Sequence, residues 1–166
     1  IFSSKPLTKA VFGDIIDMYK QQEVFEMALP INMDDLINQR VVESTRIEFK
    51  GDWNPNPIIH SICAFANDID NVGGGYLVIG IEEENGSPVL PPKGIAQERI
   101  DRILKELIGY CHCIEPLYHP IVEPVLFQGS YIIVIWAPGG HGRPYKASKD
   151  VFSDKANKLY YIRKFS

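Results

Sequence analysis

Apolar residues in this chain follow two different spacings, and the change between them predicts where helices and strands lie. The clearest helix has apolar residues at positions 100, 103, 104, 107, 108 and 111, the spacing of one helix face. A second apolar stripe, from Ile58 to Ala66, predicts another buried helix. Strands are predicted at residues 46–50, 76–81, 122–127, 131–136 and 158–163. This order predicts an α+β (or α/β) layered domain with a mixed sheet of about five strands flanked by helices.

The first 33 residues are predicted to be a helical extension, and residues 34–166 the main domain. Val11, Ile15 and Met18 recur at helical spacing and predict an amphipathic helix over residues 8–26. Pro30 interrupts this pattern, and Asn32 is suited to cap a second, short helix. The chain begins with Ile rather than Met and stops directly after a predicted strand, so we expect further domains in a longer protein.

Composition and charge narrow the class of protein. The 166 residues are 45% hydrophobic, and no run approaches the roughly 18 apolar residues of a membrane span. Three cysteines without a scaffold-like pattern predict a reducing, cytoplasmic setting. The net charge is −4, but residues 140–166 hold seven basic and two acidic residues, a net of +5 that leaves −9 elsewhere. A positive end on an acidic body predicts local phosphate binding rather than general affinity for nucleic acid.

Carboxylates gather around two of the predicted strands. Glu43 precedes the strand at 46–50, Glu48 lies within it, and Glu82, Glu83 and Glu84 follow the strand at 76–81. Glu43 and Glu48 would lie about 16 Å apart in an extended segment, so sharing a metal requires a bend between them. If the two strands are neighbours, three carboxylates meet at one sheet end. Such oxygen ligands suit Mg²⁺ or Mn²⁺, whereas a structural role in ion pairs is the simpler alternative.

Three segments together resemble the AlbA-2 domain of the Schlafen-like family. They are Glu43-Ser-Thr-Arg-Ile-Glu48-Phe-Lys50, Ile62-Cys-Ala-Phe-Ala-Asn67 and Gly73-Gly-Gly-Tyr-Leu-Val-Ile-Gly-Ile-Glu82. The resemblance implies the fold of that family and a nucleic-acid (DNA) binding domain within a bacterial protein of the kind labelled a transcriptional regulator. Related proteins are also described as ATP-binding or helicase-related, and any ATP site would belong to another domain.

The resemblance leaves a rival function open. Some Schlafen proteins are RNA endonucleases with two glutamates at this spacing and a third acidic residue after the glycine-rich strand. The matching catalytic positions here are Glu43 and Glu48, with Glu82 or Glu83 as the third, and Mg²⁺ or Mn²⁺ as the cofactor. A third alternative is an oligomerisation or regulatory module without nucleic-acid affinity. In such a module, for example a homodimer, the N-terminal helix would pack on a partner.

The basic C-terminal segment is predicted to contact nucleic acid. Its candidate residues, with Lys50 as a possible helper, are Arg143, Tyr145, Lys146, Lys158, Arg163 and Lys164. The cations would hold phosphates, and Tyr145 or Tyr160 would stack on an unpaired base. A solvated surface turn is the alternative for the loop at 138–144.

Two other motifs are assigned to structure. Gly73, Gly74 and Gly75 lie between a helix and a strand, the reverse of a phosphate loop, and predict a tight turn with close helix–strand packing. Cys111 and Cys113 are separated by one residue, which is poor spacing for zinc.

Overall fold

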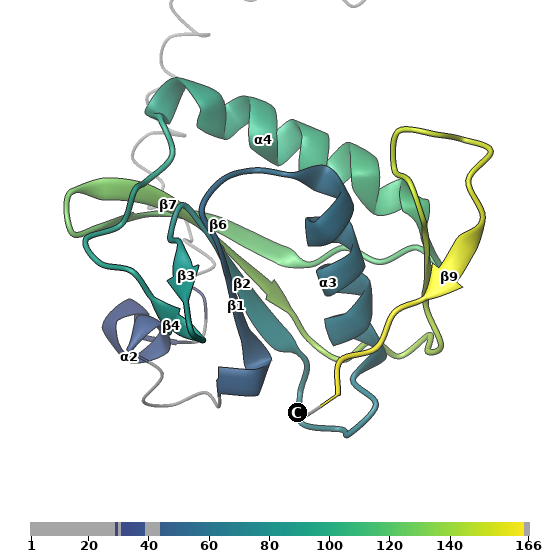
Figure 1. The fold of residues 1–166 in the computed structure, drawn as a ribbon. Helices are drawn as coiled ribbons and strands as arrows, with labels where there is room; N and C mark the ends of the chain where they lie inside the picture. Colours follow the sequence, from purple (N-terminus) through teal and green to yellow (C-terminus); the bar gives the residue numbers. More distant parts are fainter. Residues whose placement is uncertain (1–28, 30, 39–43, 165–166) are drawn as a thin grey trace, which may run out of the picture. The chain divides into compact units, whose positions relative to one another are not determined.

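The helices and strands of the domain form two layers around one hydrophobic core (Figure 1). The computed structural model describes residue 29 and residues 31–38 and 44–164. The helix predicted at 8–26 and the candidate ligand Glu43 lie outside these residues. The described helices are α2 (Met33–Ile37), α3 (Pro55–Asn67) and α4 (Gln97–Tyr110), with 3₁₀ turns η1 (Ser44–Arg46) and η2 (Cys111–Cys113).

The central sheet is mixed and has four strands in the order β1-β2-β7-β6. Its strands are β1 (Ile47–Lys50), β2 (Gly75–Ile79), β6 (Ile121–Phe127) and β7 (Ser130–Ala137). β1 runs parallel to β2, whereas β7 is antiparallel to both β2 and β6. The predicted hairpin is present, and Gln128 and Gly129 at its turn have the positive φ values that tight hairpins require.

The remaining strands form two small sheets. One is the hairpin of β3 (Glu83–Glu84) and β4 (Ser87–Pro88), and the other is the antiparallel sheet β5-β8-β9. Its members are β5 (Ile114–Glu115), β8 (Lys146–Ser148) and β9 (Lys158–Tyr160). The α+β class and the mixed sheet are therefore confirmed, but the expected fifth strand pairs outside the central sheet because β9 hydrogen-bonds to β8.

α3 and α4 cover the face of the central sheet that carries Leu77, Ile79, Ile133 and Ile135 (Figure 1). The predicted stripe of α4 is correct at Ile100, Ile103 and Leu107, which are buried. The prediction that Ile108 belongs to the buried stripe is wrong, since its side chain is 59% exposed. Within the described part of the chain, no helix has the length and apolar character needed to cross a membrane.

Local sequence explains the helix ends. The side chain of Asn32 accepts a hydrogen bond of 3.2 Å from the amide of Asp35, as expected for an N-cap of α2. α3 begins at Pro55, where the missing N–H costs nothing, and ends at Asn67, followed by the C-cap residue Asp68 in the left-handed conformation. The carboxylate of Asp68 then accepts hydrogen bonds from the amides of Val72 and Gly73, which shapes the turn between α3 and β2.

The glycines after this turn allow α3 to pack closely on β2. A Cβ atom on Gly75 would lie 2.1 Å from Cε1 of Phe65, and one on Gly74 would lie 2.0 Å from the carbonyl oxygen of Ala137. The prediction of close helix–strand packing at these glycines is confirmed. The glycines lie between the end of helix α3 and the start of strand β2, as the sequence indicated. A phosphate loop has the opposite order, because it joins a strand to the start of a helix.

Candidate functional site

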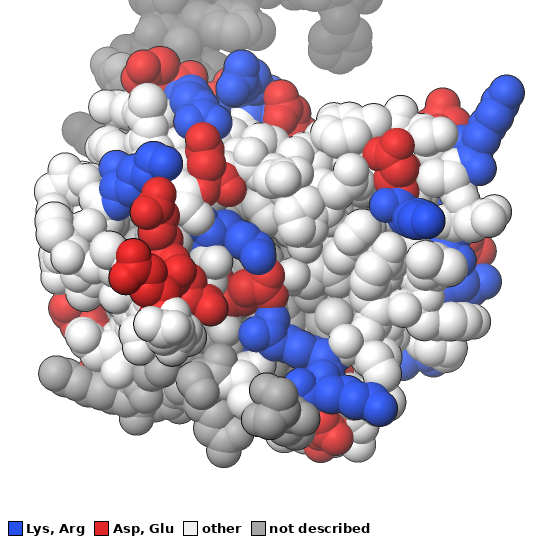
Figure 2. All heavy atoms as spheres, viewed as in Figure 1, with Lys and Arg blue, Asp and Glu red and all other residues white. Residues whose placement is uncertain are grey.

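Parallel pairing of β1 and β2 brings the predicted carboxylates to one edge of the sheet. Lys50 at the end of β1 is in register with Ile79 at the end of β2, so Glu82 to Glu84 lie next to Gly51 and Asp52. An open pocket of about 700 Å³ results, which we call the acidic pocket. Its lining residues are Glu48, Phe49, Lys50, Gly51, Asp52, Glu82, Glu83, Glu84, Lys93 and Arg163. Figure 2 shows the acidic side chains gathered over β3, with a row of basic side chains beside them.

Glu48 is held at the centre of an ion-pair cluster. It lies on the face of the sheet that α3 covers, because it is in register with Leu77. One carboxylate oxygen lies 2.7 Å from Nζ of Lys50 and accepts a hydrogen bond of 2.9 Å from the hydroxyl of Ser61. The other oxygen pairs with the guanidinium of Arg163. The carboxylate is therefore surrounded by partners in a polar cleft.

The environment of Glu48 favours its charged form. Burial raises the pKa of this carboxyl, but Lys50, Arg163 and Ser61 together outweigh that effect. The pKa of Glu48 therefore lies below its ordinary value of 4.5.

A folded-state pKa below the unfolded one makes stability depend on pH. The contribution of Glu48 is present above pH 4.5 and is lost as the pH falls from there through the folded pKa. We expect Glu48→Gln to lower the free energy of unfolding by about 1–2 kcal/mol at pH 7, because the partly buried cations lose their counter-charge. The difference in free energy of unfolding between the variant and the natural protein should shrink towards pH 3. Urea unfolding at pH 7 and at pH 3 measures this difference. An equal difference at both values would show that packing, not charge, explains the loss.

The other carboxylates of the pocket are more exposed and separately engaged. Glu82 lies 3.2 Å from Nζ of Lys93, and its side chain passes over Gly51, where a Cβ atom would lie 2.7 Å from its Cγ. Glu83 accepts a hydrogen bond of 3.4 Å from the amide of Phe49. Among the described residues, no three His, Cys, Asp or Glu side chains lie close enough to hold a metal ion. With Glu43 outside the described residues, these side chains alone do not build the three-carboxylate site that the sequence suggested.

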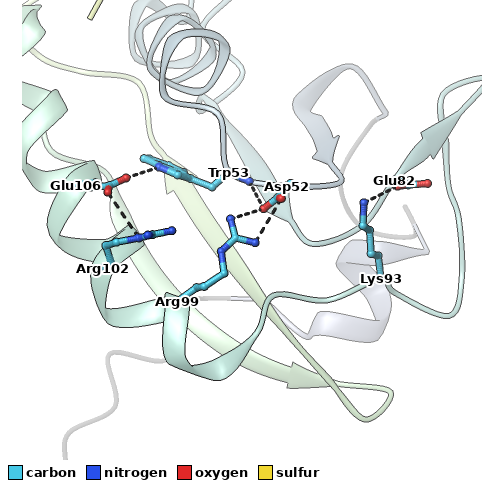
Figure 3. A network of polar contacts seen from close by, with 7 residues as sticks. All are labelled: Asp52, Trp53, Glu82, Lys93, Arg99, Arg102 and Glu106. Atoms are coloured by element: carbon cyan, nitrogen blue, oxygen red, sulfur yellow. Dashed lines mark hydrogen bonds and ion pairs between the residues drawn. The ribbon is translucent and has the colours of Figure 1, made fainter. Parts of the chain in front are cut away.

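A polar network joins the acidic pocket to α4 (Figure 3). Arg99 donates two hydrogen bonds to the carboxylate of Asp52 and lowers the pKa of that group. The indole of Trp53 donates a hydrogen bond of 2.7 Å to Glu106. The complete network consists of Asp52, Trp53, Glu82, Lys93, Arg99, Arg102 and Glu106. Its cations are matched by acids, so it fixes the turn after β1 against α4 rather than offering free positive charge.

The structure separates the predicted nucleic-acid contacts into two groups. Lys50 and Arg163 face Glu48 in the acidic pocket. Arg163 also donates to the carbonyls of Thr45 and Ile47 and lies over the ring of Phe65. It therefore ties the C-terminal segment to β1.

The second group lies on and around the β5-β8-β9 sheet. Nζ of Lys146 lies 5.6 Å from the ring centre of Tyr160, and Nζ of Lys158 lies 2.9 Å from Glu115. Arg143 binds the C-terminal end of α3 by donating to the carbonyl of Asp68 and the side chain of Asn71. Lys164 is exposed at the end of the described chain.

Tyr145 has a different environment from the one expected of a base-stacking residue. It is 5% exposed, its ring packs edge-on against Tyr118, and its hydroxyl accepts a hydrogen bond from the amide of Gly142. The neighbouring candidate Tyr160 is 59% exposed. Tyr161 is half-buried and stacks on His60 at 4.1 Å, so Tyr160 is the one of the two consecutive tyrosines that faces solvent.

Asn67 is an important residue to which the sequence assigned no role. Its side-chain amide donates to the carbonyls of Tyr145 and Tyr161, and its oxygen accepts from the amide of Tyr145. The side chain therefore joins the end of α3 to both β8 and the C-terminal segment. The sequence feature that could have indicated this role is the position of Asn67, a polar residue at the end of an apolar helical stripe.

Comparison with known proteins identifies the family. The family model described as Schlafen, AlbA_2 matches residues 43–166, so the chain belongs to this family. No curated relative matches the sequence.

A solved structure has the same kind of fold. The chain is similar to the solution NMR structure of the N-terminal domain of a protein from Nitrosomonas europaea described as related to the ATP-dependent DNA helicase RecG. The TM-score is 0.53 at 24% identity, covering 80% of this chain and 88% of that one. A crystal structure of the DIP2311 protein from Corynebacterium diphtheriae has a TM-score of 0.41 at 18% identity, covering 62% of this chain and 19% of that one.

Proposed function

We propose that this domain binds nucleic acid through the outer face of the β5-β8-β9 sheet. The observation that carries the proposal is the pair of Lys146 and exposed Tyr160, which are directly opposite each other in the sheet. Lys158 lies two residues from Tyr160 and so shares its face. A cation next to an exposed aromatic ring offers a phosphate contact and a stacking surface for a base at once.

Charge supports the same face. Residues 140–166, which include β8 and β9, have a net charge of +5, and Glu115 of β5 is the acidic residue that pairs with Lys158 on this sheet. Lys50 and Arg163 already pair with Glu48 and are left out of the proposed interface, as is the buried Tyr145. DNA is the expected ligand, in keeping with the regulators that the family resemblance implies.

We expect Lys146→Gln to weaken binding of every nucleic acid tested and to lower the slope of log affinity against log salt by about 1, because one phosphate contact is lost. Fluorescence anisotropy with labelled single-stranded DNA, duplex DNA and structured RNA, in EDTA and at several salt concentrations, measures both quantities. Lys105→Gln is the matched control, since Lys105 is exposed on α4 and should leave the slope unchanged. Absence of binding at low salt, together with a stable dimer, would contradict the proposal and favour an oligomerisation module.

A metal-dependent ribonuclease is the second candidate, favoured by the placing of Glu48, Glu82 and Glu83 in one open pocket. Against it, both oxygens of Glu48 are engaged by cations. The same labelled RNA, incubated with Mn²⁺ and separated on a denaturing gel, distinguishes the two functions. Shortened RNA that Glu48→Gln abolishes would support the nuclease, and RNA that stays intact on the gel while binding in the anisotropy assay would support the binding domain.

A further inference from the structure

Two neighbouring pockets lie along the C-terminal segment. The larger has a volume of about 310 Å³ and is lined by Asn67, Ile69, Arg143, Pro144, Tyr160 and Ile162. A smaller pocket lies between Thr45, Arg46 and the turn after α3 on one side and Arg163 and Lys164 on the other. Ile69 lines both pockets, so they are neighbours between the turn at 67–74 and the segment at 160–164, and we call the two together the groove. In Figure 1 this turn lies beside the C-terminal end of the chain.

The middle of this groove is apolar and exposed. Ile69 is 57% exposed, Val72 38%, Tyr160 59% and Ile162 46%, although each is a large hydrophobic side chain. Their grouping along one groove differs from the scattered exposed apolar residues that are common on protein surfaces. This part of the surface is therefore suited to flat, apolar faces such as those of unstacked bases.

The ends of the groove carry positive charge. Arg46 and Lys164 line one end and Arg143 the other. Arg46 donates a hydrogen bond of 2.8 Å from its Nε to the carbonyl of Gly74. Asp68 also lines the groove, but its carboxylate accepts hydrogen bonds from backbone amides and is almost fully buried, whereas Asp70 is exposed.

The small pocket also contains an unused polar atom. Among the described residues, the hydroxyl oxygen of Thr45 is the one buried side-chain polar atom without a hydrogen-bond partner. Thr45 lines the small pocket, whose volume of about 30 Å³ is enough for a water molecule that would give this hydroxyl a partner.

We propose that the groove binds unpaired nucleotides of a single-stranded nucleic acid, an inference that rests on the proposed function and specifies its substrate class. Base faces contact Ile69, Tyr160 and Ile162, and phosphates lie towards Arg46 and Lys164 at one end and Arg143 at the other. A duplex hides its base faces within the stack, so it can use the cations but not the apolar surface.

The test compares a 20-nucleotide single strand with a duplex of the same sequence, using the double variant Ile69→Ser/Ile162→Ser. Both side chains are exposed, so the fold should survive, which the thermal midpoint checks. We expect affinity for the single strand to fall about tenfold with an unchanged salt slope, because apolar contacts rather than ion pairs are lost. Affinity for the duplex should not change. Ile108→Ser, at an equally exposed site on α4, is the matched control and should change neither.

Other outcomes overturn the inference in distinguishable ways. If single strand and duplex bind equally and the double variant changes neither, nucleic-acid binding stands but the groove is not its site. If the double variant instead dissociates a dimer in sedimentation velocity and leaves binding intact, the groove is a protein interface. If no nucleic acid binds at all, the proposed function itself fails, and the inference with it.

Discussion

Replacement of Asn67 by alanine is expected to lower the free energy of unfolding by about 3–5 kcal/mol, as measured by urea unfolding. The side chain is 7% exposed and makes three hydrogen bonds of 2.7–2.9 Å to backbone groups of Tyr145 and Tyr161. Removing it leaves these buried or half-buried groups without partners, and each such group costs about 1–3 kcal/mol.

The matched control for this prediction is Asn157→Ala. Asn157 is exposed in the loop before β9, and its replacement should change stability by less than about 0.5 kcal/mol. A loss below about 1 kcal/mol for Asn67→Ala would mean that water satisfies the freed backbone groups, and that Asn67 does not hold β8 and the C-terminal segment on α3.

Gly75→Ala is expected to cost about 3 kcal/mol, because the added methyl group has no space. Its Cβ would lie 2.1 Å from the Phe65 ring and 2.6 Å from the carbonyl oxygen of Arg46, and the second of these is backbone that cannot rotate away. Urea unfolding measures the loss.

The same substitution at another glycine, Gly109→Ala, is expected to have the opposite effect on the free energy of unfolding. Gly109 lies within α4, and a Cβ there would meet no atom within 4 Å. We therefore expect a gain of about 0.5–1 kcal/mol from the better helix propensity of alanine. Equal effects at the two glycines would contradict the claim that close packing of α3 on β2 requires Gly75.

Local patterns predicted the elements whose stability depends on neighbours in sequence. The stripes of α3 and α4, the hairpin of β6 and β7 and the cap at Asn32 all follow from short-range rules, and the structure agrees with them. The parallel pairing of β1 with β2 was only a condition in the sequence argument. It is nevertheless what brings Glu48 and Glu82 into one pocket.

Long-range pairing was not predictable from these patterns. β9 was expected to extend the main sheet, but it pairs with β8, and nothing in its own sequence distinguishes those partners. Tyr145 was treated as a surface residue because it lies in a basic, glycine-rich region, yet Asn67 holds its backbone against α3. Arg163 was expected to contact phosphate because its counter-charge, Glu48, becomes its neighbour only in the folded chain.

The ion pair between Glu48 and Arg163 has a consequence for the order in which the domain is completed. The two residues are separated by 115 positions, and contacts of such long separation form late because loop closure must come first. During synthesis from the N-terminus, β1 and α3 emerge long before Arg163, so Glu48 has Lys50 and Ser61 as partners but lacks its guanidinium. The acidic pocket thus reaches its final charge only when the last strand has been translated. A prematurely terminated domain would expose a carboxylate that the finished domain neutralises.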